Sequence, residues 1–178
     1  MIKLKDKMNE YKKIRLNIHE ILKKGHQVEL HIHPHWIDAK YNFKNGTWDL
    51  SNNSKYQLKS LSVKNASKWF DVGYNTLDEI VKSYDESYQI TCFRAGGLCV
   101  QPFVLFLPLL KKYNIKYECS IAPGMKSNSS SHEYDFLNCK QLTPYRFNND
   151  ISVEDLSGEF MEFPINAYEI NFLDKIKN

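Results

Sequence analysis

The segment QVELHIHPH, at residues 27–35, limits the possible folds of this chain more than any other stretch. Apolar and polar residues alternate over residues 27–33, which predicts a strand with one buried face. Pro34 lacks an amide hydrogen and holds the preceding residue in extended backbone, so the strand has to end there. The segment therefore brings three close histidines to the end of a strand: His31, His33 and His35.

Outside this segment, helical and extended patterns alternate. Apolar residues at helical spacing predict a first helix that ends at Gly25, and a capping-box pattern from Thr76 to Glu79 predicts the start of another. Residues 35–56 are expected to be a polar connection and residues 126–132 a flexible loop. The alternation is typical of an α/β fold with parallel strands, although the second half is more β-like. We expect helices over residues 1–25, 57–70, 76–84 and 101–113, and strands over 89–93, 116–120, 144–147 and 159–163.

The composition argues against several classes of protein. A length of 178 residues suits one domain with a real core, and a net charge of +3 is too small to indicate a nucleic-acid partner. The longest apolar stretch, residues 100–110, is too short to span a bilayer. No apolar signal segment begins the chain, so a cytoplasmic location with reduced thiols is expected. The four cysteines form no CxxC pair, so no zinc–thiolate site is expected.

The three histidines are candidate metal ligands because neutral imidazole binds first-row metals. On a strand, His31 and His33 point to the same face. After the proline, His35 can fold back beside His31. A third ligand could come from His33, Glu29 or Asp38. The alternative interpretation is a chance cluster of exposed loop histidines.

Two later segments carry weaker signals. Arg94, in the run FRAGG, follows a predicted strand, and its rigid guanidinium could hold a carboxylate or another substrate group there. The alternative is a surface arginine beside a turn, which the run AGG is expected to form. In the run CSIAPG, Cys119 and Ser120 have no base nearby in the sequence, so nucleophilic catalysis has little support. His132 falls in the expected loop and is predicted to be exposed to solvent.

Taken in order, these segments resemble the motifs of polysaccharide deacetylases (the NodB-homology domain, carbohydrate esterase family four). Residues 25–35 resemble the family's Gly-His-Glu-Ile-x-x-His-(Ser/Thr)-x-x-His motif, whose two metal-binding histidines fall on His31 and His35. The family's strand-end arginine, which orients the catalytic aspartate, falls on Arg94. CSIAPG resembles Asp-Ser-Ser-x-x-Pro-Gly with Cys119 in place of the aspartate, and the run EFPIN resembles the family's Glu-(Ile/Phe)-Pro strand. The HxHPHW and FRAGG forms are most similar to the divergent WbmS-like branch, associated with surface-polysaccharide gene clusters.

This resemblance implies an α/β fold, a partial or deformed seven-stranded (β/α) barrel with its site at the carboxyl ends of the strands. Residues 1–178 would form a single domain, incomplete at the N-terminus because the family's first motif, Thr-Phe-Asp-Asp, has no match. The final Leu-x-His motif has no match either. A homo-oligomer or a partner protein could then supply the missing strands.

The implied function is metal-dependent hydrolysis of N-acetylated sugars in surface-polysaccharide metabolism. A divalent metal, expected to be zinc, would polarise the acetamide carbonyl and lower the pKa of its bound water, while a carboxylate and a histidine transfer protons. The missing motifs leave open that the chain is inactive as this fragment. The expected site residues are Arg94 as catalytic, His31, His35 and His33 as metal-binding, and Trp36 and Asp38 as substrate-binding.

Two alternatives remain open. The chain could be a non-catalytic carbohydrate-binding relic of the same fold, with aromatic side chains that stack on sugars. It could also be an HxH metallohydrolase of the amidohydrolase or PHP type, which needs further metal-binding histidines downstream, where only His132 remains. The aromatic candidates for stacking are Trp36, Tyr41, Trp48 and Trp69.

Overall fold

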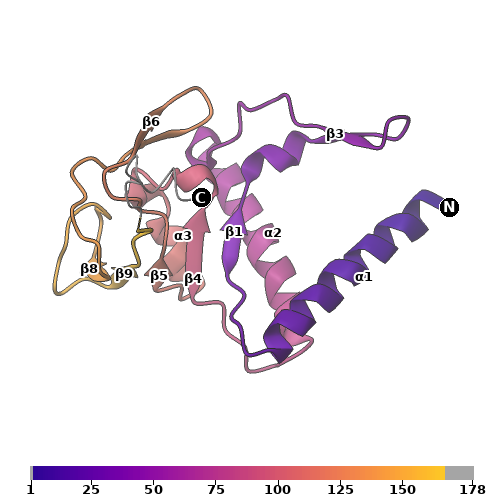
Figure 1. The fold of residues 1–178 in the computed structure, drawn as a ribbon, viewed down its shortest axis with the longest axis horizontal. Coiled ribbons are helices and arrows are strands. Elements are labelled where there is room, and N and C mark those ends of the chain that lie inside the picture. Colours follow the sequence, from indigo (N-terminus) through magenta and orange to yellow (C-terminus); the bar gives the residue numbers. More distant parts are fainter. Residues whose placement is uncertain (1, 167–178) are drawn as a thin grey trace, which may run out of the picture.

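A five-stranded sheet forms the centre of the computed structural model, which describes residues 2–166 (Figure 1). The strand order is β1-β4-β5-β9-β8; the first four strands are parallel, and β8 is antiparallel to β9. The seven-stranded barrel and the domain of 178 residues stay predictions, because the described strands form an open sheet and residues 1 and 167–178 lie outside the description. The sheet strands are β1 (Leu30–Ile32), β4 (Cys92–Ala95), β5 (Tyr117–Glu118), β8 (Tyr145–Phe147) and β9 (Phe160–Glu162).

Helices and two small hairpins surround this sheet. The α-helices are α1 (Ile2–Lys23), α2 (Val63–Lys82) and α3 (Leu107–Lys112). None of these described helices is both long and apolar enough to cross a membrane. The hairpins are β2–β3 (Lys40–Asn42 and Thr47–Asp49) and β6–β7 (Lys126–Asn128 and Glu133–Asp135). Short 3₁₀ turns cover Pro34–Asp38, Leu58–Ser60, Gly96–Leu98 and Phe103–Leu105.

The end of α1 confirms the predicted role of Gly25. This glycine has a φ of +79°, the left-handed conformation that other residues adopt only with strain. Its amide donates to the carbonyl of Leu22 at 2.8 Å, and the amide of His26 donates to that of Ile21 at 3.3 Å. Two such bonds close the last turn of a helix and satisfy carbonyls that would otherwise lack partners.

Helix α2 corrects the prediction of two helices over residues 57–70 and 76–84. The helix is continuous, and its N-cap is Ser62, whose side chain accepts a hydrogen bond from the amide of Asn65. Thr76, the expected cap, lies in the middle of the helix, where its hydroxyl donates to the carbonyl of Val72 at 2.7 Å. A Thr-x-x-Glu pattern on a helix surface mimics a capping box, and only the preceding backbone distinguishes the two.

The sheet strands overlap every predicted strand, and each is shorter than predicted. The pre-proline argument is confirmed, because His33 is extended (φ −113°, ψ 93°) and Pro34 begins a 3₁₀ turn. Three expectations are wrong in part. The polar connection over residues 35–56 contains the hairpin β2–β3, and the expected loop over residues 126–132 lies within the hairpin β6–β7. The helix predicted over residues 101–113 is reduced to a 3₁₀ turn and the short α3.

One face of the sheet packs against the helices. The ring of Phe93 in β4 lies 5.3 Å from that of Phe70 in α2 and 5.8 Å from that of Phe106, just before α3. Helix α2 passes so close to β1 that a Cβ at Gly73 would lie 3.1 Å from Cδ1 of Ile32. The opposite face is more open to solvent and carries His31, Cys92, Arg94, Tyr117 and Cys119.

Two carboxyl groups lie inside this core. Glu118 and Glu162 face each other across the β5–β9 pair, and both side chains are fully buried. Glu118 accepts a hydrogen bond from the amide of Ser120 at 2.7 Å, and Oε1 of Glu162 accepts one from the amide of Ile121 at 2.9 Å. Oε2 of Glu162 meets no donor among the described residues, and a proton held between the two carboxyls would supply one. Burial raises the pKa of both groups, and the charge of Glu118 raises that of Glu162 further.

Candidate functional site

The site begins with His31 at the carboxyl end of β1. Its Nδ1 lies 2.9 Å from the backbone carbonyl of Arg94 on the neighbouring strand. Because a carbonyl can only accept, Nδ1 carries the hydrogen, and the lone pair of the neutral ring is on Nε2. A histidine oriented by such a bond to a carbonyl is a common arrangement among metal ligands.

His33 lies beside it on the same face of the strand, as the sequence predicts. The two rings meet edge to face with centroids 4.5 Å apart. A Cβ on Gly96 would lie 3.1 Å from Nδ1 of His33 and would collide with the carbonyl oxygen of Ile32. Because Gly96, which directly follows β4, has no side chain, the His33 ring can occupy this space.

His35 lies in the 3₁₀ turn after β1 and next to His33, with ring centroids 5.4 Å apart. It stacks on the ring of Tyr56 at 4.6 Å and 11°. The ring of His132, from the hairpin β6–β7, contacts the same tyrosine at 4.1 Å. The expectation that His132 is exposed is therefore wrong: it is half-buried and belongs to this cluster. We call His31, His33, His35 and His132 the histidine cluster.

Gly97 lies against the rings of Tyr56 and His132, where only a residue without a side chain fits. It has a φ of +61°, and a Cβ there would lie 2.6 Å from Cε1 of Tyr56 and 2.7 Å from Cδ2 of His132. The run AGG was predicted to mark a turn, and the structure adds that both glycines make space for imidazole rings. No local pattern links residue 132 to residues 31–35, so only the fold reveals this contact.

The surroundings of His33 and His35 favour their neutral forms. Burial is the largest cause that lowers the pKa of His33, and the neighbouring charges of His31 and His35 lower it further. Burial and the charge of His132 lower the pKa of His35 in the same direction. The Nδ1 atoms of His33 and His35 are buried and have no hydrogen-bond partner among the described residues. Neutral rings with unpartnered nitrogens suit metal binding.

The two carboxylates considered as third ligands are engaged elsewhere. Glu29 accepts hydrogen bonds from the amides of Thr91 at 2.9 Å and Cys92 at 2.8 Å, on the strand beside β1. Asp38, also expected to bind substrate, forms an ion pair with Lys55 at 2.7 Å. In residues 2–166, no group of three or more His, Cys, Asp and Glu side chains is arranged to hold a metal ion as the rings stand. Binding an ion therefore requires side-chain rotation within the histidine cluster.

Arg94 lies on the open face of the sheet, two residues before Gly96. Its side chain is exposed, and its charge is among the causes that lower the pKa of His33. In the described part of the chain, no carboxylate lies within ion-pair distance of its guanidinium. The fork of donors is therefore open to a ligand near the cluster.

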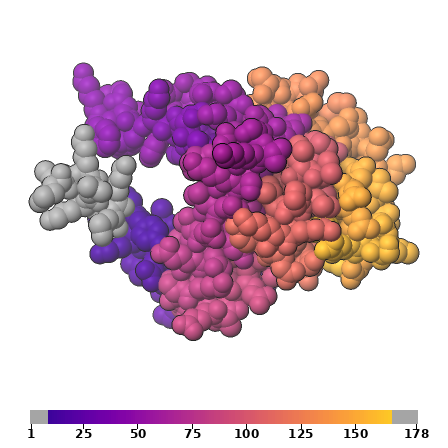
Figure 2. All heavy atoms as spheres, turned by 180° about the vertical axis from the view of Figure 1, so that it is seen from behind, coloured from indigo at the N-terminus to yellow at the C-terminus, as the bar shows by residue number. Residues whose placement is uncertain are grey.

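An exposed aromatic patch adjoins the cluster through Trp36, which is 48% exposed. Trp36 and Trp48 meet edge to face at 5.6 Å, and Tyr41 contacts Trp48 at 5.1 Å. Both Trp48 and Tyr41 belong to the hairpin β2–β3, which stands out from the body at the upper left of Figure 2. Trp69, the fourth aromatic candidate, lies on α2 and shares no ring contact with this patch among the described residues.

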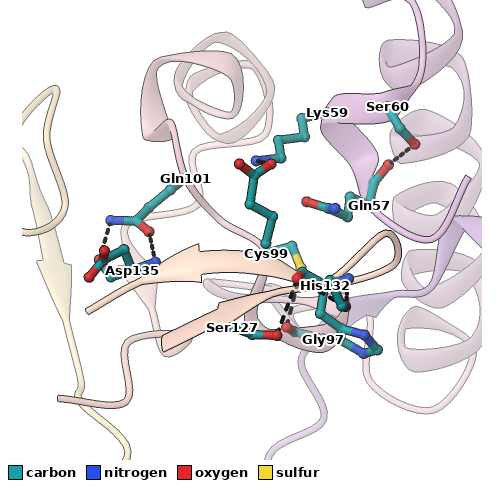
Figure 3. Close-up of polar contacts among 11 residues, drawn as sticks. Gln57, Lys59, Ser60, Gly97, Cys99, Gln101, Ser127, His132 and Asp135 are labelled. Carbon is teal, nitrogen blue, oxygen red and sulfur yellow. Dashed lines mark hydrogen bonds and ion pairs between the residues drawn. The ribbon is translucent and has the colours of Figure 1, made fainter. Parts of the chain in front are cut away.

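A polar cavity of about 470 Å³ opens beside the hairpin that carries His132. Figure 3 shows that Gln101 holds the hairpin from one side: its amide donates to the carbonyl of Asp135 at 3.0 Å, and its oxygen accepts from the Asp135 amide at 2.7 Å. Lys59 forms an ion pair with Glu133 at 2.7 Å. This volume and this mixture of amides and balanced charges suit a small polyhydroxylated ligand.

Comparison of the chain with protein-family models, with curated proteins and with solved structures found no match.

Proposed function

We propose that this chain is a metal-dependent amide hydrolase of the polysaccharide-deacetylase type, which removes acetyl groups from N-acetylated saccharides. The observation that carries this proposal is the histidine cluster. It gathers three histidines at the carboxyl end of β1 and a fourth from the hairpin β6–β7. The rings of His33, His35 and His132 all contact the ring of Tyr56. The carboxyl ends of parallel strands are where α/β proteins place their ligands.

The donor chemistry of these side chains suits a divalent metal, which the cluster would hold after the rings rotate. The donors are imidazoles, which suit zinc, copper, iron and nickel rather than magnesium or calcium. His31 directs Nε2 away from its bond to the Arg94 carbonyl, and His33 and His35 each keep an Nδ1 that has no partner within residues 2–166. A bound ion of this class supplies Lewis-acid polarisation of an amide carbonyl.

The remaining groups have roles that follow from their placement. The exposed guanidinium of Arg94 binds the carbonyl or a hydroxyl group of the saccharide through its fork of donors. Because Glu29 and Asp38 are engaged elsewhere, we assign proton transfer to an imidazole that does not hold the ion. The polar cavity takes a sugar unit away from the scissile amide, because none of its lining residues belongs to the histidine cluster. This arrangement differs from the family pattern, in which an aspartate is the base.

The first test is metal content and zinc titration of the purified protein and its variants. We expect the wild type to bind about one ion per chain and the His33→Ala/His35→Ala double variant to bind none. His132→Ala should weaken metal binding roughly tenfold or more. His26→Ala, which changes a histidine outside the cluster, is the matched control and should bind normally. Acetate release from N-acetylated oligosaccharides should follow the same order. Metal binding that survives in the double variant contradicts the proposal.

The aromatic patch supports a second candidate, carbohydrate binding without catalysis. Its rings are exposed, in mutual contact and next to the cluster, as stacking on sugar rings requires. Under this candidate, Trp48→Ala abolishes binding to an oligosaccharide in the presence of a chelator, and the His33→Ala/His35→Ala variant binds normally. Oligosaccharide binding that depends on the metal favours the first candidate.

A further inference from the structure

Two cysteines form a close pair on the open face of the sheet, apart from the histidine cluster. Cys92 lies in β4 and Cys119 directly follows β5, and their sulfur atoms are 3.5 Å apart. Both are half-buried, whereas Cys99 and Cys139 are buried in the core. Proximity and partial exposure thus set this pair apart from the other thiols.

The strand register holds the pair together. Cys92 is opposite Tyr117 in the parallel β4–β5 ladder, and the amide of Cys119 donates to the carbonyl of Phe93 at 3.1 Å. Because side chains alternate along a strand, Cys92, Tyr117 and Cys119 all point to the open face. The pair is diagonal in the ladder, since Cys119 lies two residues beyond the partner of Cys92. A disulfide has its sulfurs about 2.05 Å apart, so the two sulfur atoms must approach by about 1.5 Å for the bond to form.

We propose that Cys92 and Cys119 are a redox modification site, a dithiol that a low-molecular-weight disulfide such as glutathione disulfide converts reversibly to a disulfide. The two thiols have unequal surroundings, which assigns their order of reaction. The hydrogen bond between the two thiols and the charge of Arg94 lower the pKa of the Cys119 thiol. The same contact and burial raise the pKa of the Cys92 thiol. Cys119 is therefore the attacking thiol and Cys92 the resolving one.

The exchange is balanced without another reactant. The Cys119 thiolate attacks one sulfur of glutathione disulfide, the glutathione S–S bond breaks, and the released thiolate takes up a proton. Cys92 then loses its proton and attacks the Cys119 sulfur, which releases the second glutathione as a thiol. Two protein thiols are oxidised, and one glutathione disulfide is reduced to two thiols.

The new bond would lie next to the candidate site. Arg94 follows Cys92 by two residues, and its carbonyl is the group that orients His31. A bond that ties β4 to β5 at this point fixes the strand from which both the guanidinium and this carbonyl project. The proposal is independent of the function assigned above, because the cysteine pair exists whether or not the histidine cluster binds metal.

The test is incubation of the reduced, folded wild type with glutathione disulfide, followed by alkylation and mass spectrometry. The number of free thiols should fall from the four of the sequence to two. Trypsin cleaves after Lys82, Arg94, Lys116 and Lys126, so the bond should join peptides 83–94 and 117–126, each of which has a single cysteine. A thiol reductant should restore all four thiols.

Variants separate this pair from general thiol reactivity. Cys92→Ser should accumulate a mixed disulfide with one glutathione on Cys119, because the resolving thiol is missing. The Cys99→Ser/Cys139→Ser variant is the matched control and should form the disulfide as the wild type does. Failure of the wild type to form a bond between peptides 83–94 and 117–126 overturns the proposal, as does glutathione held stably on both cysteines.

Discussion

Replacement of Glu162 by glutamine should remove a pH dependence from the stability of this protein. Glu162 is buried opposite Glu118, and burial and that neighbouring charge raise its pKa in the folded state. An unfolded glutamate titrates at about 4.3, so between pH 6 and pH 8 the folded state holds a proton that the unfolded state has lost. A group whose pKa is higher in the folded than in the unfolded state contributes its full stability at pH values below the unfolded-state pKa. This contribution declines as the pH rises from there toward the folded-state pKa.

The expected change in the free energy of unfolding follows from the one proton that the folded state holds and the unfolded state has lost. The free energy of unfolding of the wild type should fall by about 1.4 kcal/mol per pH unit from this group, or about 2.7 kcal/mol between pH 6 and pH 8. Glutamine has nearly the same shape and does not titrate, and its side-chain amide donates to Glu118 in place of the shared proton. Glu118 then stays ionised, and Glu162→Gln lacks this slope. Histidines and cysteines titrate in both proteins, and their effects cancel in the difference. The variant should therefore gain about 2.7 kcal/mol relative to the wild type over this interval.

Urea unfolding of both proteins at pH 6, 7 and 8 measures this difference. Glu159→Gln is the control on the same segment: hydrogen bonds from Lys111 and Lys116 lower the pKa of Glu159, so it is ionised in both states throughout this range. Its substitution should shift stability by the same amount at each pH. A constant difference between wild type and Glu162→Gln from pH 6 to pH 8 would refute the shared-proton argument.

Two further pairs of substitutions test local geometry by urea unfolding. Gly97→Ala should destabilise the protein by at least about 1 kcal/mol more than Gly124→Ala. Both glycines have positive φ, but only a Cβ at Gly97 would meet side chains, the rings of Tyr56 and His132. Equal losses would contradict the packing described. Ser62→Ala should cost about 1 kcal/mol through loss of the N-cap of α2, whereas Thr76→Ala in the helix interior should be close to neutral. The reverse order would place the helix start at Thr76.

Local patterns in the sequence predict the elements around the site well. The strand before Pro34, the glycine that ends α1 and the turn after Arg94 each rest on the conformational limits of one residue type, and the structure confirms them. The Thr76 capping box fails because the same four residues fit the surface of a continuous helix.

The site itself was only half predictable. Because successive side chains of a strand point to opposite faces, residues two apart share a face, and the contact between His31 and His33 follows from their spacing alone. His132 joins them through a hairpin formed by polar residues that carry no apolar alternation, so its pattern resembles that of a flexible loop. The engagement of Glu29 and Asp38 likewise depends on backbone amides and a lysine that only the folded chain brings near.

The hairpin β2–β3 has a consequence for local unfolding. All six of its strand residues are exposed, and a two-stranded hairpin alone is marginally stable in water. Its backbone amides should therefore exchange with deuterium through local opening, whereas those of β4 and β5 exchange only when the whole sheet opens. Ring contacts among Trp36, Tyr41 and Trp48 are what oppose that opening. A sugar laid across these rings would slow exchange in this hairpin well before it changed the global unfolding midpoint.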